Sequence, residues 1–326
     1  MSADRDYAFP ELRPGMDHDH YDWTPLNTTR PKIEWPGNAK VALCVIVVLE
    51  HAEWKAPPEG FQVSNLAGGY GWGPFPDVTA WSHREYGNRV GVFRVLDVLE
   101  RHGIKPTVAL DALTAEHYPY LVRHCSARGC EFVAHGISVN RMITSRMPET
   151  EERQYIRTSI DAVTRATGKT PLGWLGPESG ESERTPRLLA EAGLDYVCDW
   201  ANDEQPYRMK VPKGTLHALP VTFPLDDVNA LWERHIDIDA YGTMIRETFD
   251  TLYRDGADNG RLLVLTLHPF LIGQPFRIGT LDAALAHIVK HDDVWTATGS
   301  EIIEAYRSAA AAASSTPPRA EQIPRA

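Results

Sequence analysis

Short apolar runs alternate along this chain with longer segments in which apolar residues recur at helical spacing. The first run, residues 40–49, is continuous enough for a strand that is buried on both faces. The segment 85–102 places Val92, Val95 and Leu99 on one helical face and ends before a glycine. The same alternation predicts further strands at 107–110, 130–134, 171–175, 196–198, 262–267 and 294–296, further helices at 116–128, 149–167, 184–192, 239–254 and 281–289, and a last helix from near residue 300.

Strands and helices in this order are typical of parallel βα units. About seven or eight such units without a break in composition favour a closed barrel, with an open doubly wound sheet as the alternative. No glycine-rich dinucleotide or phosphate fingerprint follows the first strand. We therefore predict an α/β protein whose (β/α) barrel spans residues 40–308. Five prolines predict that residues 1–39 form an extended arm, and alanine, serine and proline predict a flexible tail at 309–326.

Composition narrows the range of partners. The formal net charge of −11 argues against nucleic acid or an anionic membrane as a partner. No apolar run approaches the roughly 18 residues of a spanning helix, and the N-terminal residues lack the apolar centre of a secretory signal. The four cysteines form no C-x-x-C pair. We therefore expect a cytoplasmic protein with reduced cysteines.

Polar residues gather where the predicted strands end. Because the βα loops of a barrel meet at the carboxyl ends of its strands, residues there are expected to share one site. The residues in such positions are Glu50, His51, His135, Glu178, Asp199 and His268. All but Glu50 also have a structural interpretation: His51 as a loop cap, His135 as a hydrogen-bonded core histidine, His268 as part of a turn before Pro269, Glu178 as a solvated loop acid and Asp199 as a partner of a backbone amide or a nearby arginine.

The residue types in this set suit hydrolysis of an amide or imide. A carboxylate can activate water, and an imidazole that titrates near neutral pH can protonate a leaving nitrogen. The sequence contains no G-x-S-x-G nucleophile elbow. Assistance by Zn²⁺ held by His51 and His135 is a further possibility.

Several motifs, in this order along the chain, resemble those of the polysaccharide deacetylase family, which is also called the NodB-homology or carbohydrate esterase 4 family. The segment from His83 to Gly91, which reads HREYGNRVG, and the segment LTLHP ending at Pro269 are similar to motifs of one branch. That branch contains PuuE-type allantoinase and peptidoglycan-deacetylase-like proteins. The resemblance implies a distorted (β/α) barrel and hydrolysis of an acetamido or related carbon–nitrogen bond.

The resemblance also suggests roles for individual residues. In metal-dependent members the first motif supplies an aspartate base followed by an aspartate metal ligand, and here those places hold Glu50 and His51. The second motif supplies two histidines four residues apart. His135 matches the first, but Val139 stands in the second place and has no donor atom. The resemblance therefore implies either no cofactor or a weakly bound divalent metal, with Zn²⁺ as the candidate.

The remaining motifs complete the expected site. Where the third motif usually offers an arginine and an aromatic residue around a proline, this chain has Leu175 and Glu178 around Pro177. The last motif supplies a histidine acid, which His268 matches. We therefore expect Glu50, His268, Glu178 and Asp199 to be catalytic.

Because these residues differ from the motifs of the metal-dependent members, a small cyclic amide, ureide or imide, or an N-acetyl substrate, is a better candidate than a cell-wall glycan. Four tryptophans are candidates for lining an apolar pocket, with ordinary core packing as the alternative: Trp72, Trp81, Trp174 and Trp200. Two other functions stay open, a Zn²⁺-dependent polysaccharide or peptidoglycan N-deacetylase and a non-catalytic barrel with a binding role. The branch implied by the resemblance tends to form tetramers, so we expect a homo-oligomer, either a tetramer or a dimer.

Overall fold

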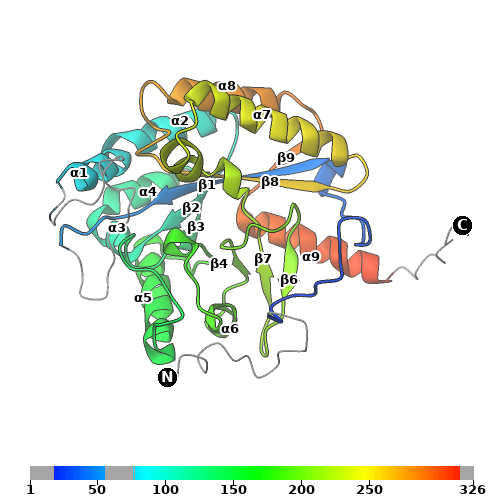
Figure 1. Ribbon diagram of the computed structural model, residues 1–326, viewed down its shortest axis with the longest axis horizontal. Helices are drawn as coiled ribbons and strands as arrows, with labels where there is room; N and C mark the ends of the chain where they lie inside the picture. The colour runs from blue at the N-terminus through cyan, green and yellow to red at the C-terminus, as the bar shows by residue number, and fades with distance from the viewer. Residues whose placement is uncertain (1–17, 56–75, 77, 316–326) are drawn as a thin grey trace, which may run out of the picture.

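The computed structural model describes residues 18–55, 76 and 78–315. Within these residues one mixed sheet curls into a half-barrel with helices on its outside (Figure 1). The sheet path is β6-β7-β5-β4-β3-β2-β1-β8, with β9 paired to β1. The strand bounds are β1 Val41–Leu49, β2 Thr107–Leu110, β3 Glu131–Ala134, β4 Gly173–Trp174, β5 Tyr196–Val197, β6 Tyr207–Met209, β7 Leu216–Ala218, β8 Arg261–Leu267 and β9 Val294–Thr296.

Strand β1 lies between β2 and β8 near one end of the sheet path, and each of its nine residues is buried. Strand β8 pairs with β1 along Val41–Val47 in a parallel register. On the other edge β9 pairs with Val41–Leu43 and β2 pairs with Ile46–Leu49. Because β1 has neighbours along both edges and side chains packed on both faces, it reads in the sequence as an unbroken apolar run.

The sheet does not close into the full barrel that the strand count favours. In the part of the chain that the structure describes, β6 and β8 lie at opposite ends of the path, and β6 is antiparallel to β7. Loops bridge the opening instead: the N–H of Leu262 donates to the carbonyl of Glu204 (2.9 Å), and the N–H of Thr222 donates to that of Val264 (3.3 Å). The distorted barrel implied by the family resemblance is therefore confirmed, and complete closure by strands is corrected.

Two predicted helices are each divided in the structure. The first becomes α1 (Val78–Tyr86), a π-helical turn at Gly87–Gly91, and α2 (Val92–Arg101). The π turn packs against the loop after β8, since a Cβ on Gly91 would lie 2.0 Å from the carbonyl oxygen of Pro269. The second becomes α3 (Ala112–His117) and α4 (Pro119–Ala127), because Pro119 has no N–H with which to continue the earlier helix.

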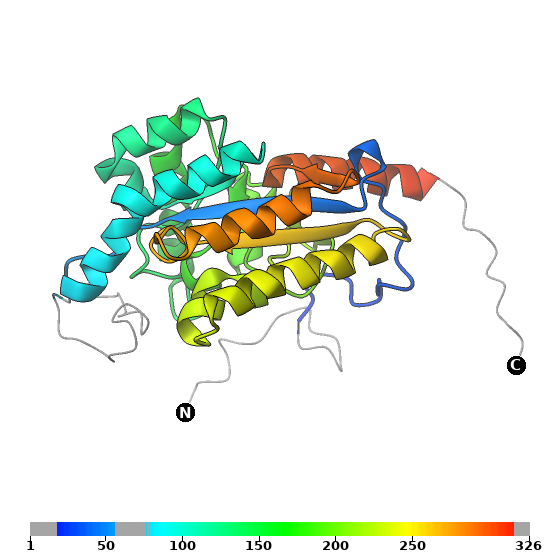
Figure 2. The same ribbon diagram turned by 90° about the horizontal axis from the view of Figure 1, so that it is seen from above.

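The later helices follow the predicted pattern. Their bounds are α5 Glu149–Thr167, α6 Thr185–Glu191, α7 Ile238–Asp255, α8 Ile278–Val289 and α9 Gly299–Ser315. Helices α7 and α8 lie side by side against the part of the sheet formed by β8 and β1 (Figures 1 and 2). Helix α9 continues past residue 308, where the tail was predicted to begin. In the described residues no helix is long and apolar enough to cross a membrane.

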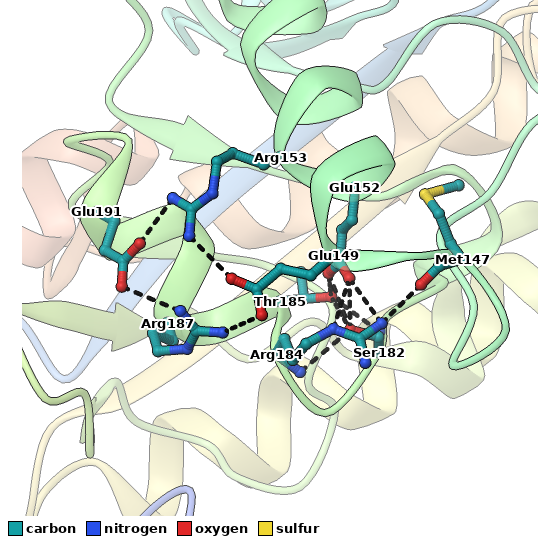
Figure 3. Close-up of polar contacts among 9 residues, drawn as sticks. All are labelled: Met147, Glu149, Glu152, Arg153, Ser182, Arg184, Thr185, Arg187 and Glu191. Carbon is teal, nitrogen blue, oxygen red and sulfur yellow. Dashed lines mark hydrogen bonds and ion pairs between the residues drawn. The ribbon is translucent and has the colours of Figure 1, made fainter. Parts of the chain in front are cut away.

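A buried carboxylate joins α5 to the segment that enters α6 (Figure 3). Glu152 is fully buried and accepts hydrogen bonds from the hydroxyls of Ser182 (2.8 Å) and Thr185 (2.6 Å). Arg184 forms an ion pair with the same carboxylate at 3.2 Å and donates to the carbonyl of Met147. These contacts fix residues 180–185, which directly follow the loop after β4.

The described part of the N-terminal arm packs against the barrel. Trp35 is 2% exposed, and its indole N–H donates to the carbonyl of Arg261 at 2.8 Å. The N–H of Ile33 donates to the side chain of Asn259, also at 2.8 Å. Farther along the arm, the carbonyl of His20 accepts from the N–H of Lys210. Residues 18–39 therefore contact the chain near the start of β8 and the end of β6, and they include a turn and a 3-10 helix at Pro36–Asn38.

Candidate active site

A pocket of about 170 Å³ opens at the carboxyl ends of the central strands. Glu50 follows β1, His135 follows β3, Glu178 lies on the loop after β4, and His268 follows β8. All four side chains line this pocket. Because these strands are parallel, their carboxyl ends face the same way, and the fold brings together residues that are up to about 220 positions apart in the chain.

Glu50 faces a buried arginine that the strand-end pattern did not single out. Arg84 on α1 forms an ion pair with the Glu50 carboxylate, and the two side chains are only 4% and 7% exposed. The Arg84 guanidinium also lies over the ring of Phe270, 4.7 Å from its centroid. Burial lowers the pKa of Arg84 to about 10, so the group remains a cation at neutral pH. This cation balances the negative charge that Glu50 carries when it acts as a base.

His135 occupies the same wall of the pocket. Its Nδ1–H donates to the carbonyl of Leu175 (2.6 Å), which leaves Nε2 as the acceptor nitrogen, 3.8 Å from Oε2 of Glu50. Burial lowers the pKa of His135, so the ring is neutral near pH 7. Nε2 has no hydrogen-bond partner among the described residues, so it is available to accept a hydrogen bond from a water molecule or a substrate N–H.

His268 is held by an aspartate that the sequence analysis missed. Asp227 is fully buried, and its carboxylate accepts from Nδ1 of His268 at 2.7 Å and from its backbone N–H at 2.9 Å. Burial lowers the pKa of His268, but the carboxylates of Asp226 and Asp227 outweigh it and raise the pKa overall. The only signal in the sequence was the adjacent acidic pair Asp226 and Asp227, which follows β7, a strand of three residues that is too short to be predicted from its pattern.

Glu178 and Asp199 have different surroundings. Glu178 is exposed at the pocket rim, and its backbone lies in the left-handed region at φ 54° and ψ 25°, a conformation that usually costs about 1–3 kcal/mol. Asp199 does not line the pocket. Its carboxylate accepts from the N–H of Gly176 (2.7 Å), and burial raises the pKa of Asp199 to about 7. Asp199 therefore supports the loop that carries Glu178, which agrees with its structural interpretation.

The expected ligand positions do not form a metal site. His51 does not line the pocket; its ring packs against that of His117, with centroids 5.0 Å apart. Successive residues of an extended chain point to opposite sides, so His51 and Glu50 diverge after β1. Val139 is fully buried against Ala52 and Trp81 and offers no donor atom.

The charges around Glu50 also argue against a metal ion at the positions expected from the resemblance. The Arg84 cation occupies the place beside the carboxylate where a metal ion would otherwise balance its charge. A second cluster, formed by Asp226, Asp227 and His268, brings its ligand atoms within 4.8 Å of one another. However, both oxygens of Asp227 already accept hydrogen bonds from His268. The residues present therefore do not fit the metal site of the metal-dependent family members.

The described tryptophans do not line the pocket. Trp174 is fully buried in the core, Trp81 packs against Val139, and Trp200 packs against Tyr21 of the arm. Trp72 lies outside the described residues. The apolar lining comes instead from side chains that the sequence analysis did not select, Val48, Leu175, Val221, Phe223 and Val228. Each tryptophan is large enough to pack in the core, so residue type alone did not separate the two roles.

Comparison with known proteins gives consistent matches. Residues 81–197, which include Arg84, His135 and Glu178, match the family described as polysaccharide deacetylase. A Schizosaccharomyces pombe protein assigned to the polysaccharide deacetylases is 27% identical over 301 residues, covering 83% of this chain and 92% of that protein. A Helicobacter pylori peptidoglycan deacetylase is 23% identical over 274 residues, covering 74% and 92%. The crystal structure of PuuE allantoinase matches with a TM-score of 0.78 at 26% identity, covering 88% of this chain and 98% of that one.

Proposed function

We propose that this protein, whose residues 81–197 match the polysaccharide deacetylase family, opens a small cyclic amide, ureide or imide without a metal ion. The reaction class is hydrolysis of a carbon–nitrogen bond other than a peptide bond. The observation that carries the proposal is one small pocket in which Glu50 and His268 each have an oppositely charged partner of their own, Arg84 and Asp227.

These two pairs suit a base and an acid. The Glu50 carboxylate accepts a proton from the attacking water, while the carbonyl carbon becomes tetrahedral. The protonated His268 then donates a proton to the departing nitrogen, because an amide anion is too basic to leave unaided. Asp227 supports this step by holding the imidazole through Nδ1, so that Nε2 carries the proton that is transferred.

Arg84 supports hydrolysis without a metal. A buried guanidinium in a pocket of low dielectric stabilises negative charge on the carbonyl oxygen more strongly than it would in water. Arg84 is 4% exposed, lines the pocket, and has no hydrogen-bond partner for Nε among the described residues. In this proposal its cation supplies the electrostatic stabilisation that a Lewis-acidic metal supplies in other members of the family.

The pocket volume supports a small ring as the substrate. A cavity of about 150 Å³ holds a benzene molecule, and this pocket measures about 170 Å³. The match to an allantoinase structure supports a cyclic ureide among the candidates. Because hydrolysis then opens a ring, both products of the cleaved bond remain in one molecule.

A substrate panel tests the proposal. Purified protein is assayed with hydantoin, succinimide, an N-acetyl amino sugar and peptidoglycan fragments, each with a chelator and with added Zn²⁺. We expect turnover of a cyclic substrate that survives chelation and is lost in Glu50→Gln and His268→Gln. The control is Glu151→Gln, an exposed glutamate on α5.

Two results would contradict the proposal. Deacetylation of a sugar or glycan only when Zn²⁺ is present would support the metal-dependent deacetylase. Absence of turnover on the whole panel, together with retained binding of one of its members, would support a non-catalytic barrel.

A further inference from the structure

A second group of ligating side chains lies on the outer surface of the barrel, away from the pocket. Asp250 comes from α7, His287 from α8, and His291 from the turn that follows α8. Their ligand atoms all lie within 4.8 Å of one another. His291 follows His287 by four residues, and its Nδ1 lies against the carbonyl of His287.

The hydrogen bonds fix the tautomers of both rings. Nδ1 of His291 donates to the carbonyl of His287 (3.0 Å), so Nε2 of His291 carries a free lone pair. Lys290 donates to Nδ1 of His287 (3.2 Å), so Nε2 of His287 bears the hydrogen that it donates to Asp250 (2.7 Å). Nε2 of His287 therefore faces the carboxylate of Asp250, and the ring of His291 is held through Nδ1. Donation from one ring nitrogen to a backbone carbonyl, as in His291, is the usual arrangement of a histidine that binds metal through its other nitrogen.

Aromatic packing restricts the rings further. The centroid of His291 lies 5.0 Å from that of Phe249 and 4.8 Å from that of Tyr253. The rings of His287 and His291 are 5.4 Å apart. Little rotamer entropy would be lost on binding an ion, because neighbouring side chains already orient both imidazoles.

We propose that Asp250, His287 and His291 bind a divalent transition-metal ion such as Zn²⁺ between α7 and α8. Two imidazole nitrogens and one carboxylate oxygen are three of the four ligands of a tetrahedral Zn²⁺ site, and water supplies the fourth. When the ion binds Nε2 of His287, the Nε2 proton passes to solvent and Nδ1 takes one up, so the ring stays a neutral imidazole and Lys290 turns away from Nδ1 into solvent. Small side-chain shifts suffice, since ligands at about 2.0–2.1 Å from Zn²⁺ lie within about 3.5 Å of one another.

This site is expected to act on stability and not on catalysis. Asp227 and His268 lie before the N-terminal ends of α7 and α8, whereas the three ligands lie toward the opposite ends. At about 1.5 Å per residue, Asp250 lies on the order of 18 Å along α7 from its first residue. An ion at this position joins the two helices that pack over β8 and leaves the pocket unchanged.

Titration calorimetry of the full chain with Zn²⁺, after removal of metal by a chelator, tests the proposal. We expect one ion per chain, and a melting temperature that rises with the concentration of Zn²⁺. His291→Gln and Asp250→Asn should each weaken binding at least about tenfold, by analogy with the loss of supporting residues in known sites. Asp292→Asn, an exposed neighbour of His291, is the matched control and should bind as wild type.

A further variant separates this site from the pocket. His268→Gln removes the histidine of the Asp226–Asp227 cluster and should leave Zn²⁺ binding intact. The proposal fails if His268→Gln abolishes binding, if His291→Gln and Asp250→Asn bind as wild type, or if no ion binds at all. None of these readouts depends on identifying the substrate.

Discussion

At the scale of single residues, the pocket depends on two charged pairs. Arg84 with Glu50 and Asp227 with His268 each join a residue at a strand end to a partner from another element. Each pair has at least one member that is almost fully buried, and a buried charge is stable only when an opposite charge lies beside it. Arg84 thereby balances a Glu50 carboxylate, and the carboxylates beside His268 favour its protonated form, which is the division of labour that acid–base catalysis requires.

The role of His268 as the acid predicts a specific kinetic defect. His268→Ala should lower kcat by about 10²–10⁴ and change KM little, because the lost interaction is made mainly in the transition state. Substrates whose nitrogen leaves easily, such as imides with electron-withdrawing groups, should lose less activity than poor leaving groups. Steady-state kinetics across such a series checks this. An equal loss for all leaving groups would indicate that His268 binds substrate or maintains structure.

The Asp227–His268 pair also predicts a change in pH dependence. Burial lowers the pKa of His268, and the two neighbouring carboxylates raise it overall, so the protonated acid persists above the pH at which an ordinary histidine loses its proton. Asp227→Asn removes one of these charges and should lower the pKa. The alkaline limb of the kcat profile should therefore move to lower pH. Asp258→Asn, on an exposed turn, is the control; an unmoved alkaline limb in Asp227→Asn would contradict this account.

At the scale of elements, close backbone packing explains two of the motifs that resemble the family. The glycines of the turn at Gly87–Gly91 lie directly against residues 269–273 after β8. This contact fixes α1, which carries Arg84, against the loop that begins with His268. Arg84 and His268 are therefore positioned relative to each other by a backbone contact that leaves no room for a side chain at Gly87 or Gly91.

A side chain added at this contact should lower the unfolding free energy. In Gly91→Ala the new Cβ would lie 2.0 Å from the carbonyl oxygen of Pro269, a backbone atom that cannot rotate away. We expect a loss of at least about 1–3 kcal/mol in unfolding free energy, together with reduced kcat. Gly279→Ala on α8 is the matched control, since no atom lies within 4 Å of its new Cβ, and it should be neutral or stabilising. Denaturant unfolding compares the two, and equal stabilities would disprove the packing argument.

The network around Glu152 gives a second prediction for the elements. Glu152→Ala removes a buried carboxylate and leaves the hydroxyls of Ser182 and Thr185 without their acceptor (Figure 3). Breaking a buried ion pair in this way typically costs about 3–5 kcal/mol. Glu151→Ala, on the exposed side of the same helix, should change the unfolding free energy by less than about 0.5 kcal/mol. Urea unfolding measures both, and a small effect at Glu152 would mean that the network does not hold α5 to α6.

At the scale of the whole molecule, the half-barrel concentrates the chemistry at one end of the sheet. Glu50 follows β1, His135 follows β3 and His268 follows β8, and these strands lie within the four at one end of the sheet path, β3-β2-β1-β8. The surface cluster of Asp250, His287 and His291 lies toward the opposite ends of α7 and α8. We also propose that the protein is a homo-oligomer, a dimer or tetramer, which light scattering of the purified chain would test.

The sequence by itself determined most of the elements and the end of the sheet at which the pocket lies. Helix α5 and strands β2 and β9 have the predicted bounds, since their apolar periodicity and end signals are local properties of the chain. The positions of Glu50, His135, Glu178 and His268 at strand ends were also predictable, because parallel strands all direct their carboxyl ends to one face.

The tertiary structure alone decided which charges meet and which aromatic residues reach the pocket. No local sequence pattern around Arg84 or Asp227 indicates that they pair with Glu50 and His268. In addition, β7, which precedes Asp227, is too short to show a periodicity. The direction of His51 and the burial of Trp174 follow from packing on particular faces of the sheet. Local spacing fixes helices and strands, but contacts between residues far apart in the chain arise only when the sheet curls and brings its elements together.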